Sequence, residues 1–286
     1  MEKYSTKWIK VSEVAPQVVL MQLARKPVNA FSTDFWLQYQ QVFDALIEDG
    51  ADVRALVLSS EFPKVFTAGL DLADANNLGA DAADDTRDAA RASLAMRKVL
   101  LKFQHAIGSP ERAPFPVIAA VHGHCIGLGL DMIGVCDIRY AASNTTFAIK
   151  EVDIGLAPDI GSLAFLPKIT GNHSLIRELT YTARNFSAAE AEKVGLVSRV
   201  VEGGRDEVVK SAIELAKFIA SKSPVAVSGS KHLITHARDH TVAENLAYTG
   251  AWNAAALMTS DILENLRATK IKQKPKFGPL KVPSRL

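Results

Sequence analysis

The sequence lacks the features that mark several classes of protein. It contains two cysteines in 286 residues and neither a C-x-x-C nor an H-E-x-x-H motif, so it predicts no disulfide framework and no bound metal. A net charge of +2 gives no reason to expect nucleic acid or an anionic membrane as the main partner. No apolar run reaches the length that spans a bilayer, and the first residues resemble no secretory or transit leader. These absences favour an intracellular protein in which Cys125 and Cys136 are reduced packing residues.

The composition is that of a soluble globular protein, with 48% hydrophobic and 22% charged residues. After Gly203 and Gly204 the pattern becomes helical, which predicts a catalytic core of residues 1–204, a C-terminal helical region of residues 205–269 and a polar tail of residues 270–286. No low-complexity linker separates these parts, so we expect that they do not fold independently.

The order of strands and helices predicts an α/β fold. Two β-prone runs around Ala15 and Pro16 indicate a hairpin. A helix capped by Ser32 and ending at Gly50 precedes a buried strand at residues 53–58, and a longer helix ends near residue 107. Strands that alternate with helices in this way favour a sheet covered by helices. The side chains that the longer helix is expected to bury are those of Leu94, Val99, Leu101 and Phe103.

The stretch from Val117 to Gly161 joins a buried strand to a glycine-rich turn and a helix start. The first amides of a helix have no partners within the helix and lie at the positive end of its dipole. The N–H groups of Leu128 and Gly129 can therefore face a developing negative charge. The third glycine of a dinucleotide-binding loop is missing here, which argues against nucleotide binding through this turn.

Three acidic residues in the same stretch stand among apolar neighbours: Asp131, Glu151 and Asp159. An apolar setting raises the proton affinity of a carboxylate, which suits a group that takes a proton and gives it back near neutral pH. Taken singly, each acid could instead be a helix cap, a salt-bridge partner or a solvated loop residue. Together they make a candidate catalytic set.

Several segments in the same order resemble the crotonase (enoyl-CoA hydratase/isomerase) superfamily, and most closely its Δ3,5-Δ2,4-dienoyl-CoA isomerases. The resemblance covers most of the chain. It implies a spiral core of ββα units with a C-terminal helical region that packs against neighbouring subunits, in trimers that are often paired as hexamers. The segments that carry it are Phe66-Thr-Ala-Gly-Leu-Asp71, Val121-His-Gly-His-Cys-Ile-Gly-Leu-Gly-Leu-Asp131, Cys136-Asp-Ile-Arg-Tyr140 and Lys150-Glu-Val-Asp-Ile-Gly-Leu156.

The resemblance also implies a reaction, the isomerisation of 3,5-dienoyl-CoA to 2,4-dienoyl-CoA in fatty-acid β-oxidation. Asp159 would remove the C2 proton, Glu151 would deliver a proton at C6, and Asp131 would assist. No cofactor is expected, because CoA is part of the substrate.

The resemblance further implies an oxyanion hole in which the backbone N–H groups of Ala68 and Leu128 hold the thioester oxygen. Gly69, Gly127 and Gly129 would lie beside the substrate. The family usually has glycine where this chain has Leu128, and we expect the leucine side chain to pack behind the turn rather than enter the acyl pocket.

Other functions on the same fold remain open from the sequence. A hydratase of the family would carry glutamate at the positions of both Asp131 and Glu151, so the aspartate at the first position and the additional Asp159 favour the isomerase. A Δ3-Δ2-enoyl-CoA isomerase would leave two of the acids unexplained. A non-enzymatic binding module is the third alternative, and RNA binding would require a basic stripe with aromatic residues, whereas the basic cluster is confined to the tail.

The last three residues, Ser284, Arg285 and Leu286, resemble the S-K-L peroxisomal address with arginine in place of lysine. The polar, basic residues before them are typical of an accessible tail. The sequence therefore predicts a peroxisomal matrix protein that binds an import receptor through this tripeptide.

Overall fold

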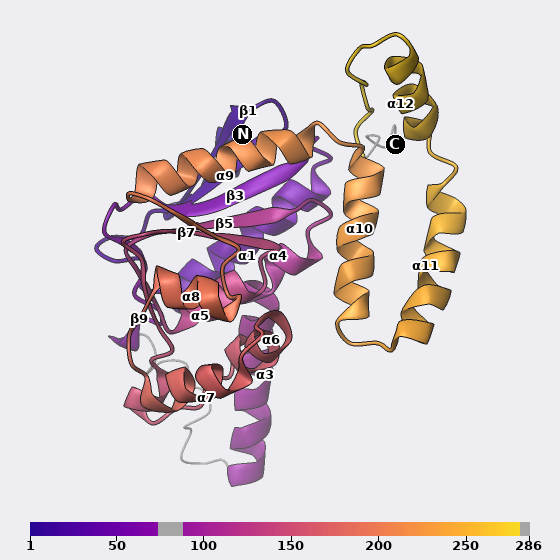
Figure 1. Ribbon diagram of the computed structural model, residues 1–286. Helices are drawn as coiled ribbons and strands as arrows, with labels where there is room; N and C mark the ends of the chain where they lie inside the picture. The colour runs from indigo at the N-terminus through magenta and orange to yellow at the C-terminus, as the bar shows by residue number, and fades with distance from the viewer. Residues whose placement is uncertain (74–87, 281–286) are drawn as a thin grey trace.

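The computed structural model describes residues 1–73 and 88–280, and its core consists of two sheets (Figure 1). The larger sheet has six strands in the order β1-β2-β3-β5-β7-β10, and the smaller has four in the order β4-β6-β8-β9. The strands are β1 Ile9–Ala15, β2 Val18–Leu23, β3 Ala55–Ser60, β4 Val65–Thr67, β5 Val117–Val121, β6 His124–Ile126, β7 Ile138–Ala142, β8 Thr146–Ala148, β9 Phe186–Ser187 and β10 Arg199–Val201. The helices are η1 Glu2–Tyr4, α1 Thr33–Glu48, α3 Ala89–Ile107, α4 Ser109–Arg112, α5 Leu128–Gly134, η2 Glu151–Ile154, α6 Ser162–Ile169, α7 His173–Thr182, α8 Ala188–Val194, α9 Arg205–Ala220, α10 Pro224–Ala237, α11 Val242–Ala256 and α12 Asp261–Lys270.

From β3 to β8, consecutive strands alternate between the two sheets. β3 is followed by β4, β5 by β6 and β7 by β8, so each pair gives a longer strand to the large sheet and a short strand to the small one. Within each sheet the strands of successive pairs are parallel neighbours. This repeat is the spiral of ββα units that the sequence predicted, and it aligns the carboxyl ends of β4, β6 and β8 at one edge.

Helices cover both faces of the six-stranded sheet. Aromatic residues of α1, among them Phe35 and Tyr39, pack into the main core, while Val208 and Ala212 of α9 pack on the opposite face (Figure 1). Strands covered on both faces have continuous apolar sequences, as β3 and β5 do. The predicted core ended at residue 204, but α9, which begins at residue 205, packs on the core. The boundary between the core and the helices that stand away from the core therefore lies after α9.

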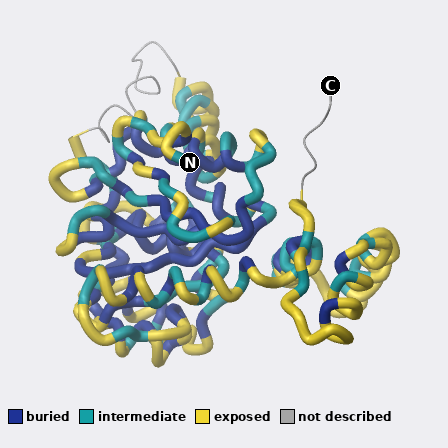
Figure 2. Tube along the Cα trace, turned by 90° about the horizontal axis from the view of Figure 1, so that it is seen from above, coloured by how far each residue is buried: buried dark blue, intermediate teal, exposed yellow. Residues whose placement is uncertain are grey.

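The helices α10, α11 and α12 form an arm that stands beside the core, and much of its surface is exposed (Figures 1 and 2). The Lys231 Nζ ties α10 to the core by donating to the carbonyl oxygens of Pro110 and Phe115 and to the Asp137 carboxylate, at 2.6, 3.0 and 2.8 Å. Large apolar side chains remain uncovered on the arm, which is typical of a protein interface. They include Ile234, Val242, Leu246, Leu257, Met258, Leu263 and Leu266.

The long helix α3 differs from its prediction in which side chains it buries. Phe103 is buried and stacks on Trp36 with ring centroids 5.1 Å apart. Leu94 and Leu101, which were predicted to be buried, are 67% and 48% exposed. Leu94 lies in the first turns of α3, which extend past the core (Figure 1). Leu101 is two residues from the buried Phe103 and therefore faces away from the core. Periodicity alone could not reveal where the neighbouring core ends.

Within residues 1–73 and 88–280, no helix combines the length and the apolar content needed to cross a bilayer. The free thiols of Cys125 and Cys136 are both buried, as predicted.

Candidate active site

The candidate site is built from the loops that follow β4, β6 and β8. β6 pairs in parallel with β4 on one side and with β8 on the other, so these loops lie next to one another. The Gly127 N–H donates to the Ala148 carbonyl at 2.8 Å, which joins the second loop to the third. A Cβ on Gly69 would lie 2.8 Å from the Ile126 carbonyl oxygen and 3.5 Å from the Leu128 nitrogen. Glycine is therefore required at position 69 for the first loop to approach the second this closely.

Two polar groups meet at the glycine turn, the backbone N–H of Leu128 and the carboxyl of Glu151. Gly127 has φ +51°, and a Cβ at that position would lie 3.3 Å from Glu151 Oε1. The next residue, Leu128, begins α5, and its N–H has no hydrogen-bond acceptor among residues 1–73 and 88–280. Its side chain is buried in the main core, so the leucine packs behind the turn as predicted. Glu151 thus lies beside the residue that precedes this free N–H.

The first loop offers a different amide from the one that the sequence predicted. The Ala68 N–H donates to the Val28 carbonyl at 3.0 Å, and the Gly69 N–H donates to Thr67 Oγ1 at 3.0 Å. The Leu70 N–H, in contrast, has no acceptor in the described part of the chain. Ala68 and Leu70 belong to the same short motif, so no sequence signal could separate them. The distinction comes from the position of the Val28 carbonyl.

Asp131 is 1% exposed on the first turn of α5. Its Oδ1 accepts hydrogen bonds from the Ser162 backbone N–H at 2.5 Å and from Ser162 Oγ at 2.8 Å. Burial raises the pKa of Asp131 to about 7, the nearby negative charge of Glu151 acts in the same direction, and the bonds from Ser162 oppose both. Ser162, at the start of α6, was not predicted as a site residue because a buried serine has no distinctive sequence signal.

Glu151 and Asp159 complete the acidic set. Burial raises the pKa of Glu151, with a further contribution from the charge of Asp159, and the buried Glu151 Oε2 has no partner among the described residues. Burial also raises the pKa of Asp159, whose backbone carbonyl accepts a 2.7 Å hydrogen bond from Gln104 Nε2. The charge of Glu151 contributes to the raised pKa of Asp131, and the charge of Asp159 contributes to the raised pKa of Glu151, so the electrostatics of the three carboxyls are linked. The fold has brought together all three acids that the sequence singled out.

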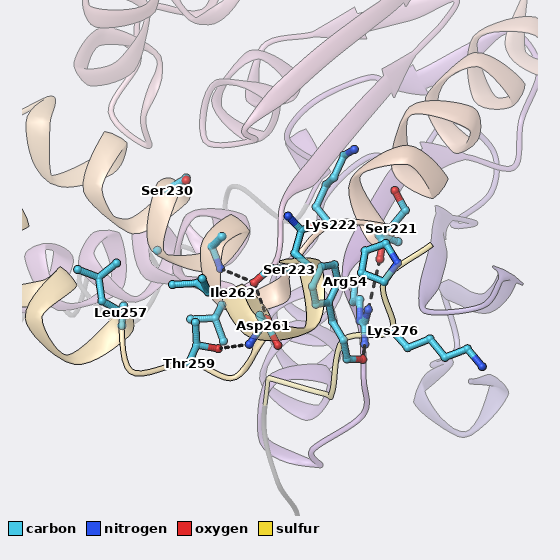
Figure 3. A pocket seen from close by; sticks show the side chains of 18 of the residues that line it. Arg54, Ser221, Lys222, Ser223, Ser230, Leu257, Thr259, Asp261, Ile262 and Lys276 are labelled. Carbon is cyan, nitrogen blue, oxygen red and sulfur yellow. Dashed lines mark hydrogen bonds between the residues drawn. The ribbon is translucent and has the colours of Figure 1, made fainter. Parts of the chain in front are cut away.

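One cavity lies away from the candidate site, beside the arm. It measures about 1130 Å³ and opens between the end of α9 and the arm (Figure 3). At its edge the buried Arg54 guanidinium donates to the Phe277 carbonyl at 2.8 Å, which holds the C-terminal segment on the core. Its lining contains none of the three acids and neither free amide. This cavity is therefore distinct from the candidate active site.

Comparison with known proteins agrees with the two-sheet spiral. A family model described as enoyl-CoA hydratase/isomerase matches residues 13–279. The chain belongs to this family. A mouse mitochondrial Δ(3,5)-Δ(2,4)-dienoyl-CoA isomerase is 43% identical over 270 residues, which cover 94% of this chain and 81% of that protein. A peroxisomal Δ(3,5)-Δ(2,4)-dienoyl-CoA isomerase from Arabidopsis thaliana is 36% identical over 282 residues, 98% of this chain and 99% of its own. The crystal structure of an enoyl-CoA hydratase from Bacillus anthracis is 29% identical, with a TM-score of 0.82 over 95% of this chain and 99% of that chain.

Replacing Ser162 by alanine is expected to raise the pKa of Asp131 above its present value near 7. The variant loses the hydroxyl donor that favours the charged carboxylate and keeps the backbone donor. Infrared spectroscopy across a pH series should show the protonated carboxyl band of Asp131 persisting to higher pH, with Asp131→Asn used to identify that band.

Ser162→Thr, which keeps a hydroxyl, is the matched control and should titrate like the unmodified protein. Since the folded-state pKa of Asp131 lies above the ordinary value of 3.8, its contribution to the free energy of unfolding is present at low pH and is lost as pH rises through 7. In Ser162→Ala this loss should extend to higher pH. An identical titration in the alanine variant would show that the hydroxyl does not control the carboxyl.

Proposed function

We propose that this member of the family isomerises 3,5-dienoyl-CoA to 2,4-dienoyl-CoA in fatty-acid β-oxidation. The observation that carries the proposal is the row of three coupled carboxyls, Asp131, Glu151 and Asp159, beside two free backbone amides. Relatives that are 36% to 43% identical over more than nine-tenths of this chain bear the name of this isomerase, which supports the assignment.

The proposed oxyanion hole consists of the Leu70 and Leu128 N–H groups. Both lack acceptors among the described residues, and Gly69 holds the two loops in close approach. Two donors aimed at the thioester oxygen stabilise the negative charge that develops on it, and loss of one such donor typically costs about 2.7 to 4 kcal/mol of barrier. Ala68 would serve in place of Leu70 only if its bond to Val28 were given up or shared.

Glu151 is the proposed base at C2, and Asp159 the proposed acid at C6. Glu151 lies against Gly127, the residue before the Leu128 amide that would bind the thioester oxygen, so it is close to the carbon next to that thioester. Asp159 is coupled to Glu151 but lines a separate cavity toward α3. This order is the reverse of the one inferred from the sequence resemblance.

The chemical step moves one proton and two double bonds. Glu151 takes the C2 proton, and the electrons of the C2–H bond enter a conjugated enolate whose oxygen is held by the two amides. Asp159 then donates a proton to C6, which leaves double bonds at C2–C3 and C4–C5. The enzyme is restored when Glu151 loses its proton and Asp159 regains one. Asp131 has a pKa of about 7, and in its protonated form this residue places no negative charge beside Glu151.

The experiment that tests this function supplies 3,5-octadienoyl-CoA and a 2-enoyl-CoA in separate reactions. We expect the absorbance of a 2,4-dienoyl thioester to appear with the first and no water addition with the second. Efficient hydration without diene isomerisation would instead assign a hydratase, the family alternative. Turnover of neither substrate would favour a binding protein.

The functional unit is proposed to be a homo-oligomer, a trimer or a hexamer. The uncovered apolar side chains of the arm support this, because a single chain leaves them in water. Sedimentation equilibrium should give a mass of three or six chains, and a monomer would reject the proposal.

The proposed compartment is the peroxisome matrix, reached through Ser284, Arg285 and Leu286, which lie outside the described residues. The Arabidopsis relative is named as peroxisomal, whereas the mouse and human relatives are named as mitochondrial. Deleting the tripeptide should leave activity in vitro unchanged and abolish peroxisomal import in cells. Mitochondrial location of the full chain would reject this address.

A further inference from the structure

The loop between η2 and α6 carries Asp159 and is anchored at both of its ends. At its start the Leu156 N–H donates to the Glu151 carbonyl at 3.0 Å. At its end the Ser162 N–H and hydroxyl donate to the Asp131 carboxylate at 2.5 and 2.8 Å. The ends of the loop are therefore fixed to the residues that carry the other two acids of the site.

The middle of this loop, residues 157–160, has few restraints. It forms neither helix nor strand, and Ile160 contributes an apolar contact with the main core. In the described part of the chain, one hydrogen bond joins these four residues to another segment, and it runs from Gln104 Nε2 to the Asp159 carbonyl at 2.7 Å. Because a hydrogen bond is directional, this one fixes the orientation of the Asp159 backbone.

Gln104 is itself held in place by the core. It lies on α3, where its neighbour Phe103 is buried and stacks on Trp36 with ring centroids 5.1 Å apart. Ala106, two residues further on, is fully buried. α3 therefore presents the Gln104 amide from a fixed position, and Gln104 and Asp159 line the same cavity of about 590 Å³.

We propose that Gln104 is a positioning residue that decides which carbon of the reaction intermediate receives the proton. By holding the Asp159 backbone, Gln104 keeps the Asp159 carboxyl at C6 and away from C4. The inference rests on the proposed function, in which Asp159 is the acid at C6. Gln104 acts on the substrate through Asp159, because its amide donates to the protein backbone.

The chemistry of the intermediate requires such a control. Removal of a C2 proton from a 3,5-dienoyl thioester gives a dienolate whose negative charge is shared by the oxygen, C2, C4 and C6. A proton delivered to C6 leaves double bonds at C2–C3 and C4–C5, whereas a proton delivered to C4 leaves them at C2–C3 and C5–C6. The two products have the same atoms and the same charge, so the position of the acid selects between them.

The size of the expected effect follows from the distance over which a catalytic group acts. A displacement of about 1 Å can cost roughly 10²-fold in rate. C4 and C6 are two bonds apart, so a modest movement of the Asp159 carboxyl toward C4 both slows proton delivery to C6 and opens the competing route.

The experiment uses Gln104→Met, which keeps an unbranched side chain of similar length and loses the donor. The enzyme is given 3,5-octadienoyl-CoA in deuterium oxide, and NMR locates the deuterium in the product. The unmodified enzyme should place it at C6 of 2,4-octadienoyl-CoA. In the variant we expect kcat for that product to fall roughly tenfold to 10²-fold, C2 exchange to continue, and 2,5-octadienoyl-CoA labelled at C4 to appear. KM should change little, because the lost donor serves the protein rather than the substrate.

Gln40→Met is the matched control. Gln40 is also a half-buried glutamine on a helix, but its amide donates at 3.1 Å to Asp44 of the same helix, α1. This control should keep the rate and the product of the unmodified enzyme. Gln104→Glu is a second variant of the same size, whose carboxylate would face the Asp159 carbonyl with an acceptor, so it should also give label at C4. Thermal melts should show that all three variants fold.

An unchanged rate with deuterium confined to C6, in folded Gln104→Met and Gln104→Glu, would overturn the proposal. Slower turnover with all of the label at C6 would also reject it, because the proton would then be delayed rather than redirected. An equal fall of C2 exchange and isomerisation would reject it as well, since that result means a general loss of the site. Failure of the proposed function is seen separately, in the unmodified enzyme, which would then form no 2,4-octadienoyl-CoA, and that result would reject this role of Gln104 with it.

Discussion

Glu151→Gln should abolish hydrogen exchange at C2 and diene isomerisation together, with kcat falling roughly 10²- to 10⁴-fold. The amide keeps the shape of the side chain but cannot accept a proton. Glu151 is the carboxyl beside the glycine turn, with Oε1 3.3 Å from the position that a Cβ on Gly127 would occupy, so it lies close to the proposed thioester site. Mass spectrometry of substrate recovered from deuterium oxide measures the exchange, and diene absorbance measures the product.

The controls for this variant separate lost chemistry from lost structure. Glu151→Asp keeps a carboxyl but shortens the side chain by one methylene, so it should retain part of the exchange. A thermal melt and circular dichroism should show that both variants fold. Rapid C2 exchange in a folded Glu151→Gln protein would remove Glu151 from the role of base.

Asp159→Asn should block isomerisation by a similar factor, roughly 10²- to 10⁴-fold, while exchange at C2 continues. In this variant the base and both free amides remain, so the enolate still forms and returns its proton to C2. What is missing is the acid that delivers a proton to C6. The ratio of C2 exchange to isomerisation should therefore rise by orders of magnitude, a result that partial unfolding would not produce.

The opposite pair of results would restore the order inferred from the sequence. If Asp159→Asn loses C2 exchange and Glu151→Gln keeps it, then Asp159 is the base and Glu151 the acid. The pH profile gives a further check, because burial raises the pKa of both groups. Activity should fall at low pH, where the base is protonated, and at high pH, where the acid has lost its proton.

The sequence by itself determined the elements whose formation depends on local pattern. The hairpin around Ala15 and Pro16, the helix from Thr33 to Glu48 and the strand from Val117 to Val121 are all present, because turn residues, caps and apolar periodicity specify them. The Ser187-x-x-Glu190 spacing is another local pattern of this kind, and the two residues form a complete capping box. The three acids were also identifiable, since acidic residues in apolar stretches are conspicuous.

The tertiary structure alone decided which backbone amides are free and which leucines are exposed. β4, β6 and β8 have three residues each, too few to show a pattern, and they exist because each pairs with a neighbour from a distant part of the chain. The Val28 carbonyl reaches Ala68 and leaves Leu70 unpaired only because the loop from the hairpin crosses there. Ser162 meets Asp131 across 31 residues of sequence, and Leu94 is exposed because the core ends before it. Such contacts join residues far apart in the chain, so their outcome depends on the packed fold rather than on local pattern.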